Sequence, residues 1–167
     1  MKKKIFITGA EGFIGSNLVE KLLELDFRVT CLVLYNSFNN PGWLKEILTK
    51  KNKNLKIIYG DIRDTEQMKN VLKNQDIIVN LAALIGIPYS YHTPRSYFET
   101  NIFGLMNILE AVNKNKIKKI IHVSTSEVYG SPQYIPIDEK HRYYGQSPYS
   151  ASKISADQLA LSYYNSF

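Results

Sequence analysis

The 167-residue chain is long enough for one domain with a sizeable core, and its 44% apolar and 22% charged residues are ordinary for a soluble protein. The net charge is +6, but the lysines are scattered, which argues against a nucleic-acid partner. Cys31 is the only cysteine, which excludes a disulfide framework and favours a reducing cytoplasm. His92, His122 and His141 match no metal-ligand spacing, and no segment approaches the ~20 apolar residues that span a membrane.

Short apolar runs alternate with helix-period segments from one end of the chain to the other. The predicted strands cover residues 5–7, 28–34, 55–59, 76–81 and 118–124. The predicted helices begin at Ile14, cover 43–48, follow Asp64 or Thr65, cover 94–115 and begin near Pro148. This alternation predicts an α/β fold, a Rossmann-type doubly wound parallel sheet with helices on both faces, over residues 1–167. The long loop over 130–147 is expected to face a substrate.

The periodicity also predicts which side chains of each helix face the core. These are Ile14, Leu18, Leu22 and Leu25 in the first helix, and Met68, Val71 and Leu72 in the third. In the long helix they are Phe98, Ile102, Leu105, Leu109 and Val112, and in the last they are Ile154, Leu159 and Leu161.

A glycine triplet separates the first strand from the first helix. Gly9 permits a sharp turn, Gly12 lets the backbone approach a pyrophosphate, and Gly15 lets the helix pack closely. The N–H groups and the positive end of the helix dipole then face the phosphates. A plain tight turn is the alternative, but strand, glycines and helix together favour a dinucleotide site. The predicted contacts in this stretch are Gly9, Glu11, Gly12, Phe13, Ile14 and Gly15.

Other candidate cofactor residues follow the later strands, where open α/β sheets bind ligands. Asp61 can accept from an adenine amino group and the N–H of Ile62 can donate to the ring, although a turn or cap role is equally open. Small residues after the fourth strand, Leu81, Ala82 and Ala83, let the backbone run beside a cofactor, with plain packing as the alternative. Asn36 and Ser37 end the second strand without an acid or an arginine, so the choice between NAD and NADP stays open. Asn101 completes the predicted set.

Tyr149 and Lys153 lie four residues apart, and so on one face of the last helix. An ammonium group beside a phenol stabilises the phenolate, which makes Tyr149 a candidate general base for an alcohol. Thr125 can hydrogen-bond the same oxygen. Because the chain has twelve tyrosines, a chance Y-x-x-x-K match is an alternative, but its place after the fifth strand favours function.

Together these motifs resemble the extended short-chain dehydrogenase/reductase family of nucleotide-sugar enzymes. The motifs are T-G-x-x-G-x-x-G, G-D-I-R-D at 60–64, L-A-A at 81–83 and S-P-Y-S-A-S-K at 147–153. S-T-S-E-V-Y-G at 124–130 looks like the active-site turn of sugar-nucleotide 4,6-dehydratases. The stretches 34–39 and 81–94 look most like UDP-N-acetylglucosamine-type enzymes, which feed nonulosonic (legionaminic-type) acid pathways.

The resemblance implies a reaction and a role for each residue. Tyr149 deprotonates the sugar 4-hydroxyl as hydride passes to NAD or NADP, and Lys153 also binds the nicotinamide ribose. Glu127 removes the C5 proton, water leaves from C6, and hydride returns to C6. Ser126 stands where glucose-type dehydratases place an acid, so it would position the hydroxyl or a water. The family also implies a homodimer through the helices at 94–115 and 148–163.

Two alternatives remain beside the dehydratase. One is a nucleotide-sugar 4-epimerase or decarboxylase that shares Tyr149 and Lys153, and the other is a non-catalytic dinucleotide-binding module. Family members continue well beyond Phe167, so residues 1–167 are expected to be the NAD(P)-binding part of a longer enzyme, with most of the substrate domain absent. Such a piece alone is expected to be weak in binding and inactive.

Overall fold

The computed structural model describes residues 2–167, which fall into two compact units. Unit 1 comprises the chain up to Ala82 together with Asn107–Val123. Unit 2 comprises Ala83–Met106 and Ser124–Phe167. Unit 1 contains the sheet and the glycine triplet, and unit 2 contains the Tyr149–Lys153 helix.

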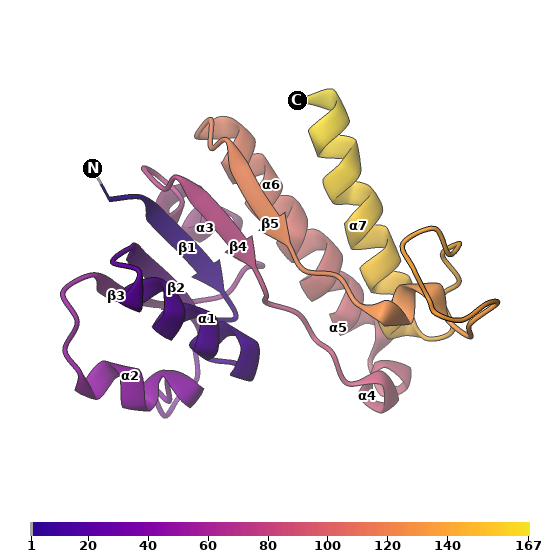
Figure 1. Ribbon diagram of the computed structural model, residues 1–167, viewed down its shortest axis with the longest axis horizontal. Helices are drawn as coiled ribbons and strands as arrows, with labels where there is room; N and C mark the ends of the chain where they lie inside the picture. The colour runs from indigo at the N-terminus through magenta and orange to yellow at the C-terminus, as the bar shows by residue number, and fades with distance from the viewer. Residues whose placement is uncertain (1) are drawn as a thin grey trace. The chain divides into compact units, whose positions relative to one another are not determined.

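Unit 1 is built on a five-stranded parallel sheet in the order β3-β2-β1-β4-β5 (Figure 1). The strands are β1 (Lys4–Thr8), β2 (Arg28–Leu34), β3 (Leu55–Gly60), β4 (Ile77–Asn80) and β5 (Lys119–His122). All five predicted strands are confirmed, and the predicted Rossmann-type sheet with them. The strand order reverses at β1, between β2 and β4, which is where open α/β sheets bind ligands.

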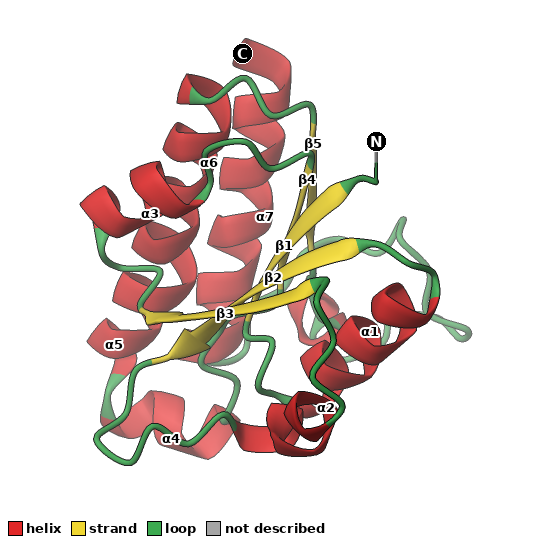
Figure 2. Ribbon diagram, turned by 90° about the vertical axis from the view of Figure 1, so that its left-hand side faces the viewer, coloured by secondary structure: helices red, strands yellow, loops and turns green. Residues whose placement is uncertain are grey.

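Helices cover both faces of this sheet (Figure 2). One face carries α1 (Phe13–Glu24), the 3-10 turn η1 (Gly42–Leu44) and α2 (Lys45–Thr49), with Val19, Leu44 and Ile47 in its core. The other carries α3 (Thr65–Val71) and the part of α6 (Gly104–Lys114) that belongs to unit 1. Its core includes Phe6, Met68, Leu72, Ile78, Ile108 and Ala111. Apolar burial on both faces explains why β1 and β2 read as continuous apolar runs, whereas β5 is less covered and its Ile121 is 43% exposed.

The start of α3 is set by its cap. The Asp64 carboxylate accepts a hydrogen bond from the backbone N–H of Gln67 at 2.9 Å, which satisfies one of the free amides of the first turn. Met68 and Leu72 are fully buried, as predicted.

The predicted apolar face of α1 is wrong at its two ends. The side chains of Ile14 and Leu25 are 65% and 59% exposed, whereas Gly15, Ser16 and Val19 are buried. Small residues face inward at the start of α1 because the helix lies close to the turn before it, and Leu25 already stands at its C-cap. Leu18 and Leu22 pack partly buried against the core, as predicted.

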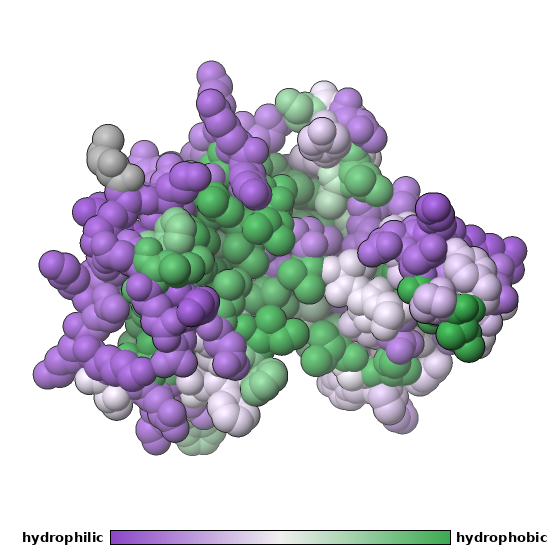
Figure 3. All heavy atoms as spheres, in the orientation of Figure 1, coloured by the Kyte–Doolittle hydropathy of each residue, from purple (hydrophilic) through white to green (hydrophobic). Residues whose placement is uncertain are grey.

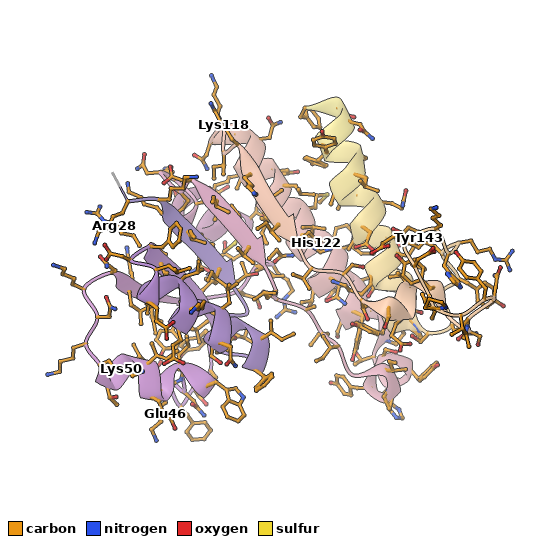
Figure 4. All side chains as sticks on the ribbon, in the orientation of Figure 1. Arg28, Glu46, Lys50, Lys118, His122 and Tyr143 are labelled. Atoms are coloured by element: carbon orange, nitrogen blue, oxygen red, sulfur yellow. The ribbon has the colours of Figure 1, made fainter. Side chains whose placement is uncertain are left out.

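Unit 2 is helical. It contains α4 (Ile87–His92), α5 (Pro94–Phe98), the π-helical turn η2 (Glu99–Phe103), the first residues of α6, the 3-10 turn η3 (Ser126–Tyr129) and α7 (Pro148–Ser166). The expected loop over 130–147 is present, and Tyr143, labelled in Figure 4, belongs to it. Sequence periodicity missed α4, which is only six residues long and has a proline in its first turn.

The single helix predicted over 94–115 is interrupted by the π-helical turn. Such a turn takes one more residue than an α-helical turn, so the inward face shifts by one position along the chain. Tyr97 and Asn101 are therefore buried, while Phe98, predicted to face the core, is exposed. Beyond the turn Leu105 and Leu109 are buried as predicted.

The inward face of α7 is mostly polar. Its buried residues are Tyr149, Ser150, Ser152, Lys153, Ala156 and Asp157, whereas Leu161 is half exposed, contrary to the prediction. Ser147 caps the helix reciprocally with Ser150, at 3.0 and 2.9 Å, which places Tyr149 in the first turn. Apolar periodicity therefore describes α7 poorly.

Charged side chains are scattered over the surface of unit 1 rather than gathered in one patch. Hydrophilic residues cover much of the visible side around α2, β2 and β3 (Figure 3), and Arg28, Lys50 and Lys118 lie at different places on it (Figure 4). Lys50 pairs with Glu20 at 2.7 Å. None of the helices described in residues 2–167 is long and apolar enough to cross a bilayer.

The Thr8 side chain joins the ends of β1 and β4. Its fully buried hydroxyl donates to Asn80 Oδ1 at 2.6 Å and accepts from the backbone N–H groups of Leu81 and Ala82 at 3.2 and 3.1 Å. Three polar groups of the β4 end thus share one hydroxyl as a partner, and of these the Leu81 N–H also donates to the Thr8 carbonyl oxygen at 3.3 Å.

We expect Thr8→Val to lower the free energy of unfolding by about 1–3 kcal/mol, because valine keeps the shape but leaves buried polar groups unpaired. Urea unfolding followed by circular dichroism measures this loss. The matched control is Thr30→Val in β2, a half-buried threonine with no side-chain hydrogen bond recorded among the described residues. The control is expected to change stability by less than about 0.5 kcal/mol, and an equal effect of both substitutions would contradict the role of Thr8.

Candidate functional site

The glycine turn after β1 has two positions that only glycine can fill. Gly9 has φ +64°, and a Cβ on it would lie 2.8 Å from the backbone nitrogen of Ala82. A Cβ on Gly15 would lie 2.3 Å from the carbonyl oxygen of Gly9. These two glycines bring the loop against the end of β4 and α1 against the loop.

Gly12 differs, because the fold alone does not require a glycine there. Its φ is −74°, and the nearest protein atom to an added Cβ is 3.4 Å away, about van der Waals contact. Gly12 is the exposed N-cap of α1, which has no side-chain cap. The first-turn amides of α1 and its dipole thus remain available to an anion that approaches the bare backbone. These features fit the pyrophosphate of a dinucleotide, and Phe13 and Ile14 lie exposed beside them.

Asp61 follows β3, as the prediction required, but its carboxylate already has a partner. Arg63 approaches both oxygens, with Nε at 3.1 and 3.0 Å and an Nη at 2.6 Å. Partial burial opposes ionisation, yet the hydrogen bonds from Arg63 outweigh it and hold the pKa of Asp61 below its ordinary value. Ile62 is a core residue whose carbonyl accepts from Asn107 at 3.0 Å. An adenine contact by Asp61 and Ile62 stays a prediction.

The segment after β2 is organised by Asn36. Its Oδ1 accepts from the N–H groups of Phe38 and Asn40 at 3.2 and 3.0 Å, and Ser37 beside it is exposed. Sequence reasoning missed one feature of this place. Glu11 of the glycine turn reaches across to accept from the N–H of Leu34, the last residue of β2, at 2.8 Å.

Leu81 and Ala82 are held by Thr8, so the backbone after β4 runs directly against Gly9. In unit 2, Asn101 receives the N–H of Leu84 at 2.9 Å and donates to the Leu84 carbonyl and to Ser152 at 3.0 and 2.9 Å. Asn101 thereby ties the segment that follows Ala83 to α7. Its assignment as a cofactor contact stays a prediction.

Tyr149 and Lys153 lie on the inward face of α7. Tyr149 is 7% exposed, and its ring meets Tyr97 edge to face with centroids 6.2 Å apart. Lys153 is 4% exposed. Burial lowers the pKa of its ammonium group below the usual value, and the Asp157 carboxylate opposes that shift. Tyr97 and Asp157 were not predicted, and the Y-x-x-x-K-x-x-x-D spacing was the available signal for Asp157.

The turn η3 presents the other predicted catalytic residues. The Thr125 hydroxyl accepts from the Glu127 N–H at 3.3 Å, which leaves its proton free to be donated. The side chains of Ser126 and Glu127 are exposed. Just before the turn, Ser124 donates to Asp157 at 2.5 Å, so η3 and the inward face of α7 are connected. Within unit 2 the structure therefore brings the turn and the Tyr149 helix together.

These geometric features agree with the comparisons with known proteins. The profile of the GDP-mannose 4,6-dehydratase family matches residues 6–167. The chain belongs to this family. The resemblance to the extended short-chain dehydrogenase/reductase enzymes is thus confirmed at the level of the GDP-mannose 4,6-dehydratase family.

Relatives within this broader group carry out different reactions. A dTDP-D-glucose 4,6-dehydratase from Dictyostelium discoideum is 36% identical over 99% of this chain and 41% of its own length. DesIV, a dTDP-glucose 4,6-dehydratase from Streptomyces venezuelae solved with NAD, superposes with a TM-score of 0.90 at 30% identity, covering 98% of this chain and 52% of its own. A UDP-N-acetylglucosamine 4-epimerase from Methanobrevibacter ruminantium M1 gives 0.86 at 34% identity, covering 100% and 52%. The chain thus spans about half the length of these relatives.

We expect Asp157→Asn to lower the pKa of Lys153 further, because it removes the carboxylate that stabilises the buried ammonium. The measurement is an NMR titration of the Lys153 side chain. Glu139→Gln, an exposed acid in the 130–147 loop, is the control and should leave that pKa where it is. An unchanged or raised pKa in Asp157→Asn would show that Asp157 does not act on Lys153.

Proposed function

We propose that this chain is the dinucleotide-binding part of a nucleotide-sugar 4,6-dehydratase that uses NAD or NADP. The substrate class is an NDP-hexose, with NDP-N-acetylglucosamine the first choice, and the product is the 4-keto-6-deoxy sugar. The observation that carries the proposal is the polar inward face of α7, where Lys153 is buried four residues after Tyr149 and Glu127 is presented by the turn packed against that helix.

Each residue has a role in this reaction. Tyr149 accepts the proton of the sugar 4-hydroxyl, and Lys153 stabilises the phenolate that does so. A bound nicotinamide dinucleotide supplies the hydride acceptor for C4 and the hydride donor for C6. Glu127 then takes the proton at C5, which the 4-ketone has acidified, and the C6 hydroxyl departs as water with the proton that Tyr149 took from the 4-hydroxyl. When hydride reaches C6, Glu127 returns its proton to C5. Thr125 hydrogen-bonds the reacting oxygen, and Ser126 positions the departing hydroxyl or a water molecule.

The cofactor half of the proposal rests on unit 1. The open position at Gly12 and the uncapped first turn of α1 support binding of a pyrophosphate there. The other residues that we propose as cofactor contacts in unit 1 are Gly9, Gly15, Asn36, Ser37, Asp61, Ile62, Leu81 and Ala82. The proposed contacts Ala83 and Asn101 belong to unit 2. Residues 1–167 would then form the NAD(P)-binding part of a longer enzyme. Its relatives, about twice as long, support this reading.

We further propose a cytoplasmic homodimer that pairs through the helices at 94–115 and 148–163. Large apolar side chains on these segments remain exposed, among them Phe103 and Leu161, at 53% and 50%. Exposed apolar side chains gathered on neighbouring helices are typical of a protein interface. The free cysteine Cys31 is compatible with a reducing compartment.

A nucleotide-sugar 4-epimerase is the second candidate, and similarity to the Methanobrevibacter ruminantium epimerase favours it. Both reactions begin with Tyr149 and hydride removal from C4. They diverge at Glu127, because only dehydration needs a base for C5. A decarboxylase would instead release carbon dioxide from a uronic acid, and a binding module would change no substrate.

The test is to incubate full-length protein with UDP-, dTDP- and GDP-linked hexoses and N-acetylglucosamine and to follow their masses. We expect one of these to lose the mass of one water. Glu127→Gln is expected to slow that loss by at least about 100-fold while the fold is kept, because a general base contributes about that much. Glu139→Gln is the matched control and should retain the rate.

A 4-epimer of unchanged mass, formed equally well by Glu127→Gln, would replace the dehydratase with an epimerase. No turnover of any donor, together with full retention of cellular function in Tyr149→Phe, would favour the binding module.

A further inference from the structure

Glu11 connects the glycine turn to the end of the neighbouring strand. Its Oε1 accepts from the backbone N–H of Leu34, the last residue of β2, at 2.8 Å. Its main-chain oxygen accepts from the N–H of Trp43 at 3.0 Å. The glutamate thus brings a carboxylate from the first loop of the fold to the carboxyl end of the second strand.

The second carboxylate oxygen of Glu11 is buried and has no hydrogen-bond partner among residues 2–167. No lysine or arginine of that part of the chain forms an ion pair with it. The Glu11 carboxylate also acts on the Cys31 thiol. Burial, and to a smaller extent this carboxylate, raise the pKa of the thiol to about 12. A buried acceptor without a donor is costly, so a donor from a bound molecule would stabilise this arrangement.

The first two residues of η1, Gly42 and Trp43, contact the glycine turn around Glu11. Gly42 has φ +57°, and a Cβ on it would lie 2.6 Å from the Glu11 carbonyl oxygen. The ring of Trp43 meets Phe13 edge to face, with centroids 6.1 Å apart. Gly42 therefore lies against the main chain of Glu11, and the exposed rings of Phe13 and Trp43 meet beside it.

The end of β2 carries no acid of its own. In dinucleotide-binding folds an acid near this point accepts a hydrogen bond from the adenosine ribose 2′-hydroxyl, and an arginine accommodates a 2′-phosphate. Residues 35–44 contain neither an acid nor a basic residue. The Glu11 carboxylate is the charged group that the structure places there.

We propose that Glu11 recognises the adenosine ribose in place of the missing strand-end acid and makes the site selective for NAD over NADP. The proposal rests on the dinucleotide site proposed above. A ribose hydroxyl would donate to the unpaired oxygen, whereas a 2′-phosphate has no comparable donor and would bring negative charge against a carboxylate. The residues that end β2 do not distinguish NAD from NADP. Under this proposal the Glu11 carboxylate does so, in favour of NAD.

The test is to measure dissociation constants of NAD and NADP for the full-length protein by titration calorimetry. We expect NAD to bind at least about tenfold more tightly than NADP, equivalent to about 1.4 kcal/mol. In Glu11→Gln we expect most of this preference to disappear, through weaker NAD and stronger NADP binding. Glu24→Gln, an exposed glutamate of α1 paired with Lys21, removes the same charge elsewhere and should keep the preference.

A rescue makes the test independent of any general damage by the substitution. Tyr35 is the first residue after β2 and is 66% exposed, so Glu11→Gln combined with Tyr35→Asp returns an acid to the ordinary place. We expect this double variant to regain a preference for NAD. Unfolding free energies of all variants show whether the fold is kept.

Three results would overturn the proposal. A wild-type preference for NADP would do so without any variant, and an unchanged ratio in folded Glu11→Gln would remove Glu11 from recognition while leaving the dinucleotide site intact. Failure of the full-length protein to bind either dinucleotide would instead overturn the proposed cofactor site itself, and the role of Glu11 with it.

Discussion

The buried ammonium group of Lys153 is the constraint around which unit 2 is arranged. It is the one lysine or arginine buried among the described residues, and removing such a charge from water is costly. Asp157, one helical turn further along α7, offsets part of this cost, and Ser124 hydrogen-bonds the same carboxylate. A helix that only had to pack would carry leucine at such a position. A buried cation four residues after a buried tyrosine on the same helix is a feature typical of functional sites.

In unit 1 the arrangement depends on backbone geometry rather than on a buried charge. Thr8 ties the ends of β1 and β4 together, and Gly9 lets the loop run against Ala82. The glycine turn is held by these contacts, so the first turn of α1 is presented in a fixed direction. Of the three glycines in this turn, Gly12 alone has no structural reason to be glycine, so it is the most informative of them about a ligand.

Much of this arrangement was predictable from local patterns. The strands followed from apolar runs, the turn at 9–15 from its glycines, and the Tyr149–Lys153 pair from its spacing on a helix. Apolar periodicity did not predict the buried face of a helix where that face is polar or lies close to the backbone of a neighbouring turn. The inward face of α7 is polar, small residues bring α1 close to its turn, and the π-helical turn exchanges Phe98 for Tyr97. The contact of Glu11 with Leu34 joins residues 23 positions apart, and no local pattern contains that information.

We propose that hydride leaves C4 of a nucleotide sugar and returns to C6 while Glu127 and Tyr149 move the protons. The most direct test supplies full-length protein with nucleotide sugar deuterated at C4 and locates the label in the product by NMR. We expect a 4-keto-6-deoxy sugar that carries the deuterium at C6. Deuterium that remains at C4, in an epimer or in unchanged substrate, would contradict it.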